Sequence, residues 1–267
     1  MSSKSDFNPV KAYILLFLVL LWTFFSLALY GLLAIIPFVN QRFLIPIYHT
    51  VMCFLMGVKI VTKGKQSSEQ STLFVSNHVS YLDIPVLGKL IKAGFVAKSE
   101  IASWPLISLL ARLQDSIFIE RKPSKAKSQM QILRQHLEEG NSLILFPEGT
   151  STNGAQVLPL KSSLFSAAES QKAEIIIQPV SVVYSEHNGK GMDQALRDHF
   201  AWYADFPFGA HFVKMLGMGT ITAVITFNEP IRLSDYSSRK ECAMACEEIM
   251  RNSFDDAFIS SGSTRGD

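Results

Sequence analysis

The chain has 267 residues, of which 48% are apolar and 18% are charged, and its formal net charge is +2. That length allows one or two domains, and that composition excludes an intrinsically disordered chain and a collagen-like repeat. The near balance of charge gives no electrostatic basis for binding nucleic acid. Three cysteines, Cys53, Cys242 and Cys246, make no even disulfide framework and favour a reducing compartment or a membrane interior.

The first segment with structural meaning is a long apolar stretch near the N-terminus. No charged residue occurs between residues 12 and 41, and residues 13–36 form a helix long enough to cross a bilayer core. Lys4 and Lys11 also fit the basic region of a cleaved signal peptide. However, the apolar run exceeds the roughly 7–15 residues of a typical signal-peptide core. We therefore expect a retained membrane anchor.

A second apolar segment, residues 43–58, is shorter and is interrupted by Pro46 and Gly57. It fits a dip into one leaflet or a buried interfacial helix better than a full span. Residues 1–58 are thus expected to form the membrane-embedded part. The larger cluster of positive charges follows this part, which favours a globular domain on the cytoplasmic side; its members are Arg42, Lys59, Lys63 and Lys65.

Short apolar runs then alternate with helix-length segments across residues 59–258. The expected strands are residues 72–76, 94–98, 116–120, 142–146, 174–184 and 221–227. The expected helices are residues 84–91, 104–113, 124–139 and 162–169, with a last helix from a capping box at Ser238 to about residue 258. This alternation predicts an α/β fold with a largely parallel central sheet flanked by helices. Residues 259–267 are expected to be a disordered tail.

The first candidate for chemistry is the segment NHVSYLDIP, residues 77–85, which directly follows an expected strand. His78 and Asp83 are five residues apart and meet only if His78 lies on the turn and Asp83 lies in the first helical turn. Asp83 then orients one imidazole nitrogen and leaves the other free as a base. The alternative is structural, with His78 satisfying a loop and Asp83 capping a helix.

The second candidate is the segment LFPEGTSTNG, residues 145–154, again at a strand end. Gly149 and Thr150 supply donors for a phosphate or another anion, while Glu148 suits a substrate hydroxyl or a cation. Arg121 follows a further strand and suits a bidentate grip on phosphate. Lys161 is a second candidate cation. For each cation taken singly, a solvated surface position is the alternative.

These candidates coincide in one expected place. His78, Arg121 and Glu148 all lie at or just beyond the C-terminal ends of expected strands, and these ends line the ligand crevice in open α/β sheets. A base, a cation and a donor loop beside a membrane segment suit the transfer of an acyl group to a phosphate-bearing, lipid-like alcohol.

The same residues resemble the motifs of the glycerolipid acyltransferases. NHVSYLDIP is similar to their HxxxxD motif and FPEGT to a second signature. FIER, ending at Arg121, resembles their arginine motif, and IIIQPVSVVY, around Pro179, resembles their proline-bearing block. The four blocks run in the family's order, and the upstream segment MGVKIVTKG resembles bacterial 1-acylglycerol-3-phosphate acyltransferases.

The resemblance implies a role for each matching residue. His78 is implied to be the general base, and Asp83 its orienting partner. Arg121 is implied to hold the acceptor's phosphate, assisted by Glu148, Gly149 and Thr150, and the acceptor attacks an acyl thioester directly. Residues 59–258 are then the acyltransferase domain. The implied activity is acylation of 1-acylglycerol-3-phosphate to phosphatidic acid at a bacterial inner membrane, with acyl-CoA or acyl-carrier protein as co-substrate and no cofactor.

One departure from the motif puts the acceptor's headgroup in question. Many family members carry Arg directly after FPEGT, whereas Ser151 stands there in this chain. Residues 157–168 and 202–212 resemble bacterial enzymes that acylate lyso-ornithine lipid, which has no phosphate. Another lysolipid, such as lyso-ornithine lipid, is therefore the alternative acceptor. Lys161 and His211 deserve a test in that context.

Two alternatives belong to other functional classes. A serine hydrolase of lipid esters requires an activated nucleophile, but the chain has no G-x-S-x-G elbow, and Ser80 and Ser151 are the only serines within the HxxxxD and FPEGTSTNG segments. A non-catalytic lipid-binding membrane protein is the other. The six histidines show no HExxH or other tight ligand spacing, so no metal site is expected.

Overall fold

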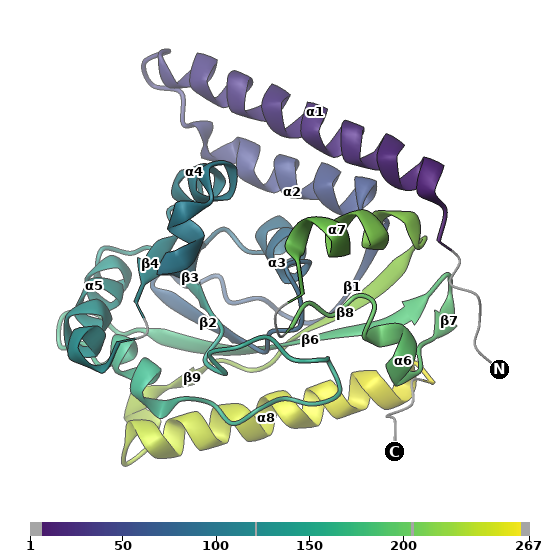
Figure 1. Cartoon of the computed structure of the whole chain (residues 1–267). Helices are drawn as coiled ribbons and strands as arrows, with labels where there is room; N and C mark the ends of the chain where they lie inside the picture. The colour runs from purple at the N-terminus through teal and green to yellow at the C-terminus, as the bar shows by residue number, and fades with distance from the viewer. Residues whose placement is uncertain (1–6, 121, 204–205, 263–267) are drawn as a thin grey trace.

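The computed structural model describes residues 7–120, 122–203 and 206–262. Its strands join one mixed sheet in the order β1-β8-β6-β2-β5-β3-β4, with β7 and β9 paired to β6 (Figure 1). The strands are β1 (Val58–Gly64), β2 (Thr72–Ser76), β3 (Gly94–Lys98), β4 (Ile117–Ile119), β5 (Leu143–Leu145), β6 (Ile176–His187), β7 (Lys190–Gly191), β8 (Ile221–Phe227) and β9 (Ile231–Arg232).

The central strands are parallel, as the alternation of elements predicts. Strand β2 pairs in parallel with both β5 and β6, and β3 pairs in parallel with β4 and β5. Parallel neighbours require long crossovers, and helices supply them between β2 and β5. Strand β6 pairs antiparallel with β8, so β8 and its parallel neighbour β1 run against the central strands. The expected α/β fold is confirmed.

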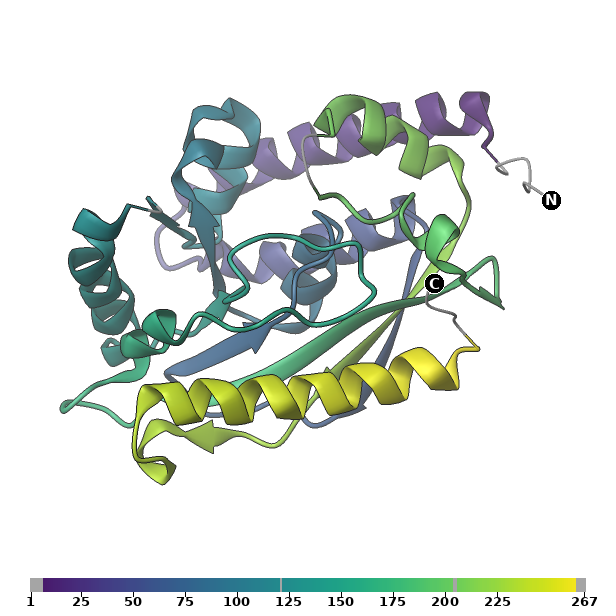
Figure 2. The ribbon, with the colours of Figure 1, turned by 60° about the horizontal axis from the view of Figure 1, so that its bottom comes forward.

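Helices cover both faces of this sheet. They are α1 (Pro9–Ala34), α2 (Leu44–Leu55), α3 (Asp83–Leu90), α4 (Pro105–Leu113), α5 (Ala126–Glu138), α6 (Gln194–Arg197), α7 (Phe208–Gly217) and α8 (Arg239–Ser260). Short 3₁₀ turns are η1 (Gln41–Phe43), η2 (Ser99–Ser103), η3 (Pro123–Lys125), η4 (Ser162–Ala168) and η5 (Leu233–Asp235). Figure 1 shows α1, α2, α3 and α7 on one face, and Figure 2 shows α8 running across the other.

Two hydrophobic clusters fill the spaces between these layers. Because side chains alternate along a strand, Phe74 of β2 packs into the cluster under α1, α2, α3 and α7. Its neighbours Leu73 and Val75 pack into the cluster with α5 and α8. A strand buried on both faces reads as a continuous apolar run, which is what made β2 predictable.

The apolar N-terminal helix lies along the molecule. Asn8 caps α1 by accepting a hydrogen bond from the Lys11 N–H at 3.0 Å, and α1 begins at Pro9 and ends at Ala34. The expected bounds, 13–36, are thus four residues late at the start and two late at the end. The helix is long and apolar enough to cross a membrane. One stripe packs on the domain through Ala12 and Val19, with Leu15, Leu16 and Trp22 half-buried beside it. Many apolar side chains on the other side of the helix, such as Ile14, Phe17 and Leu21, are exposed.

The fold differs from the expectations at four places. Residues 58–64 form the edge strand β1, where a segment boundary was expected, because β1 lacks the continuous apolar run of a central strand. Residues 208–217 form α7, for which no helix was expected because the aromatic side chains of this segment obscured its helical pattern. The expected helix at 162–169 is the 3₁₀ turn η4, and α8 runs to Ser260, into the expected tail. Residues 263–267 of that tail lie outside the described residues.

Candidate active site

The site begins at the turn that follows β2. Asn77 is buried there, and its amide group makes two hydrogen bonds to the main chain of β6. The Asn77 Nδ2 donates to the Val182 carbonyl at 2.9 Å, and the Val182 N–H donates to the Asn77 Oδ1 at 2.7 Å. This pair of bonds fixes the turn against the neighbouring strand, so the next residue, His78, leaves the sheet in one direction.

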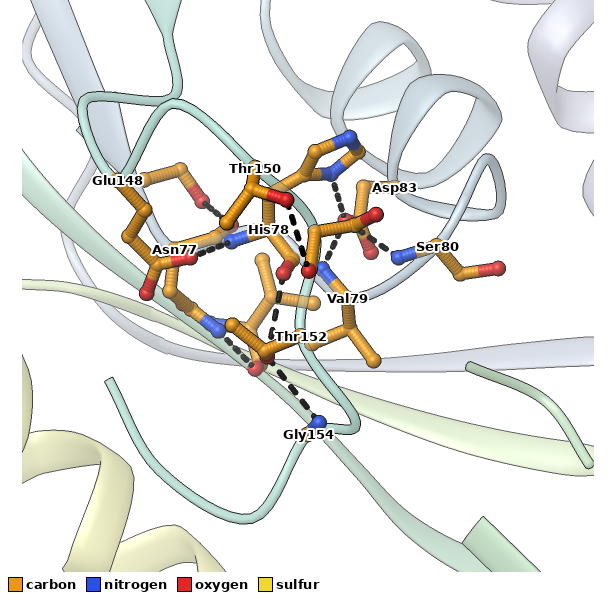
Figure 3. Close-up of polar contacts among 12 residues, drawn as sticks. Asn77, His78, Val79, Ser80, Asp83, Glu148, Thr150, Thr152 and Gly154 are labelled. Atoms are coloured by element: carbon orange, nitrogen blue, oxygen red, sulfur yellow. Dashed lines mark hydrogen bonds and ion pairs between the residues drawn. The ribbon is translucent and has the colours of Figure 1, made fainter. Parts of the chain in front are cut away.

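The structure brings His78 and Asp83 together. The His78 Nδ1 lies 2.7 Å from the Asp83 Oδ2, with His78 on the turn and Asp83 as the first residue of α3 (Figure 3). This is the arrangement that their spacing requires. The chain reverses within the five residues, which a continuous helix does not allow.

Asp83 is fully buried, and four donors surround its carboxylate. Its Oδ2 accepts from the His78 ring, from the Val79 N–H at 2.8 Å and from the Ser80 N–H at 3.1 Å. Its Oδ1 accepts from the Tyr184 hydroxyl at 2.7 Å. Because Oδ2 acts as an acceptor throughout, the His78 Nδ1 carries the ring proton, and the Nε2 lone pair remains available.

The imidazole of His78 is fixed by a ring contact as well as by its hydrogen bond to Asp83. The ring of His78 stacks on Phe146 with centroids 4.2 Å apart and an interplanar angle of 19°. Its side chain is 22% exposed. Among the described residues, no protein group hydrogen-bonds the Nε2. A fixed ring with one open nitrogen is what a general base requires.

Glu148 binds the main chain of the same turn. It is only 4% exposed, and both carboxylate oxygens accept from the main chain: Oε2 from the His78 N–H at 3.2 Å and Oε1 from the Leu158 N–H at 2.9 Å. Burial raises the pKa of Glu148 to about 8, although these two hydrogen bonds act in the opposite direction. In this structure Glu148 thus positions the His78 turn, and its expected contact with substrate stays a prediction.

The loop after Glu148 wraps around the turn. The Thr152 N–H donates to the His78 carbonyl at 2.9 Å, and the Thr152 Oγ1 donates to the same oxygen at 3.3 Å (Figure 3). Gly149 has a positive φ of 73°, which favours glycine. Thr150 is exposed. The expected substrate contacts, half-buried Gly149 and exposed Thr150, therefore lie on a loop that is fastened to the His78 turn.

Of the two expected cationic side chains, the structure describes Lys161 but not Arg121. Lys161 lies at this loop, with its ammonium against Gly149. Arg121 lies outside the described residues, so its role stays a prediction. Beside it, Glu120 forms ion pairs with Lys122 at 3.2 Å and with Lys125.

Sequence reasoning gave no role to Asn77 or Tyr184. Asn77 directly follows the apolar strand and directly precedes the candidate base, and an amide at that junction was a signal that it fastens the turn. Tyr184 lies 101 residues from Asp83 in sequence, and only the pairing of β6 with β2 brings it near. No local pattern marks such a contact.

Comparisons with known proteins indicate the family. The Acyltransferase family model matches residues 57–183. The chain is 35% identical to the lyso-ornithine lipid O-acyltransferase of Rhodobacter capsulatus over 78% of this chain and 74% of that one. It is 28% identical to the 1-acyl-sn-glycerol-3-phosphate acyltransferase of Neisseria gonorrhoeae over 58% of each chain.

A solved structure shares the fold. The 1-acyl-sn-glycerophosphate acyltransferase PlsC of Thermotoga maritima superimposes with a TM-score of 0.65, covering 92% of this chain and 97% of that one at 20% identity.

Replacing Asp83 by Asn tests the pairing of His78 with its carboxylate. The amide still offers an oxygen to the donors at Oδ2, and its NH₂ group faces the Tyr184 hydroxyl, which can accept. The fold is therefore expected to survive, while the charge that stabilises an imidazolium is lost. We expect kcat to fall by about 10³-fold or more, as in a catalytic triad. Asp256→Asn, an exposed site on α8, is the control, and equal turnover in both variants contradicts the pairing.

Replacing Tyr184 by Phe removes one donor from the buried carboxylate. A hydrogen bond to a charged group contributes about 1.5–3 kcal/mol to the free energy of unfolding. We expect Tyr184→Phe to lower the free energy of unfolding by this amount in denaturant titrations. Tyr13→Phe, on the exposed face of α1, is the matched control. An unfolding midpoint equal to the wild type shows that the Tyr184 bond adds nothing.

The raised pKa of Glu148 predicts a pH dependence of stability. Between the ordinary value of 4.5 and about 8, the folded chain binds a proton that the unfolded chain has lost. The free energy of unfolding therefore falls as the pH rises through this window. Glu148→Gln is expected to flatten this slope in thermal melts at a series of pH values. Glu248→Gln, at an exposed carboxyl on α8, should keep it, and an unchanged slope in Glu148→Gln refutes the assignment.

Proposed function

The chain belongs to the acyltransferase family, and on that premise we propose that it transfers an acyl chain from a thioester to the free hydroxyl of lyso-ornithine lipid. The observation that supports acyl transfer is the buried pairing of His78 with Asp83, which leaves the Nε2 open. The observation that supports this acceptor is the similarity to relatives named for it.

The proposed reaction is a direct nucleophilic attack of the acceptor hydroxyl on the thioester, with His78 as the general base. The acceptor hydroxyl gives its proton to the His78 Nε2 while its oxygen attacks the thioester carbonyl carbon. The new C–O bond forms, the C–S bond breaks, and the thiolate takes the proton from the imidazolium. Asp83 stabilises that imidazolium through the hydrogen bond at Nδ1. No acyl-enzyme intermediate is needed, because the acceptor attacks directly.

The acceptor expected first from the motifs was 1-acylglycerol-3-phosphate, and the relatives support it less well than the alternative. Similarity to lyso-ornithine lipid O-acyltransferases extends over 78% of the chain at 35% identity, against 58% at 28% for the phosphate-specific relative. Ser151 agrees with this preference, because it replaces the arginine that follows FPEGT in many members. We therefore assign the phosphate acceptor second place.

The proposed setting is a membrane surface. Exposed apolar side chains of α1 suit contact with lipid, which a lysolipid acceptor requires. We propose the cytoplasmic face of a bacterial inner membrane, with acyl-CoA or acyl-carrier protein as donor, since both thioesters are made in the cytoplasm.

A hydrolase with a serine nucleophile has less support from the site. The Ser80 side chain is fully buried, and its Oγ has no hydrogen-bond partner among the described residues. It therefore lacks both access to substrate and a base within reach.

An acceptor panel tests the proposal. Purified protein in detergent is mixed with acyl-carrier protein or CoA carrying a labelled acyl chain, and with lyso-ornithine lipid or 1-acylglycerol-3-phosphate. We expect ester formation with lyso-ornithine lipid at a kcat/KM above that for the phosphate acceptor. His78→Ala should be inactive, whereas Ser80→Ala should retain most activity. If neither donor gives product with lyso-ornithine lipid, the proposal that this lipid is the acceptor is wrong.

A further inference from the structure

Lys161 occupies an unusual position for a surface lysine. Its side chain folds over Gly149, and a Cβ atom added at Gly149 would overlap its Nζ. Gly149 directly follows Glu148, whose carboxylate binds the His78 N–H. The Lys161 side chain is exposed, and its ammonium lies against the loop that supports the candidate base.

The backbone that carries Lys161 is fastened on both sides. The Lys161 N–H donates to the Pro147 carbonyl at 3.0 Å, and the Leu158 N–H donates to Glu148 at 2.9 Å. The Leu160 N–H donates to the Glu247 Oε2 at 2.9 Å. Glu247 is itself fixed by Arg251, with nitrogen–oxygen distances of 3.1 and 2.8 Å. The segment is thus tied to the catalytic loop and to α8.

The ammonium has no counter-ion of its own. Among the described residues, no carboxylate lies within ion-pair distance of Lys161, whereas Lys98, Lys122 and Lys172 each pair with an acid. Glu148 is the acid nearest in the loop, but its two oxygens already accept from the main chain. The donors of this ammonium, which lies beside the loop, are therefore available to an anion.

We propose that the Lys161 ammonium binds the anionic group of the acceptor's headgroup and thereby places the acceptor hydroxyl at the His78 Nε2. This inference rests on the proposed function, under which the anion is the carboxylate of the ornithine headgroup. Carboxylate and phosphate share the chemistry that an ammonium recognises, so the acceptor decides which anion is bound. Lys161 is a substrate contact in this account, and Glu247 is a positioning residue that acts through it.

The test compares two acceptors that differ only in charge. Wild type, Lys161→Met and Lys161→Arg are assayed with lyso-ornithine lipid and with its carboxyl methyl ester. We expect Lys161→Met to raise KM for the acid by about tenfold, the scale of a charged hydrogen bond, with a smaller change in kcat. KM for the ester should stay unchanged, and Lys161→Arg should recover most of the loss. Lys240→Met, at an exposed lysine on α8, is the control.

Equal losses for acid and ester in Lys161→Met overturn the proposal, because they show a structural effect that ignores the headgroup charge. Glu247→Gln should reproduce the acid-specific rise in KM in weaker form.

Failure of the proposed function gives a different result. If the wild type acylates only 1-acylglycerol-3-phosphate, lyso-ornithine lipid is excluded, and Lys161 is tested by comparing that acceptor with uncharged monoacylglycerol. A loss confined to the phosphate acceptor then supports the role of Lys161, and an equal loss for both refutes it.

Discussion

A buried carboxylate surrounded by donors is the interaction on which this structure depends. Removing a carboxylate from water costs several kcal/mol unless hydrogen bonds replace the lost solvation. Asp83 receives four such bonds, from two backbone N–H groups, a tyrosine hydroxyl and an imidazole. Satisfying it therefore fixes the tautomer of His78, the shape of the turn and the entry into α3 at the same time. Asp83 lies in the first turn of α3, where the positive end of the helix dipole further stabilises its negative charge.

Three segments far apart in sequence meet to build that site. The turn after β2 carries His78, β6 supplies Tyr184, and the loop after β5 supplies Glu148. Because β2 lies between β5 and β6 and runs parallel to both, the turn after β2 lies beside the end of β5 and the middle of β6. Each of these segments carries one part of the site, and Asn77 and Thr152 fasten the parts to one another.

Helix α7 reaches the same turn through aromatic contacts. Tyr81, between His78 and Asp83 in sequence, donates or accepts a hydrogen bond with His211 of α7 at 2.9 Å. Its ring also contacts Phe208 and Phe212 of α7 at centroid distances of 5.1 and 5.7 Å. Helix α7 packs in the same cluster as α1, the helix with the exposed apolar face. The His78 turn therefore lies beside α7, which shares its hydrophobic cluster with α1, the helix that is long and apolar enough to cross a membrane.

The sequence by itself determined the central strands, the crossover helices and the pair His78 and Asp83, because burial patterns and a five-residue spacing are local properties of the chain. The tertiary structure alone decided the antiparallel course of β8, the edge strand β1 and the contact of Tyr184 with Asp83. It also turned Glu148 inward to the main chain. These features depend on which strands become neighbours, and pairing between distant segments is set by the packing of the whole core, which no local pattern encodes.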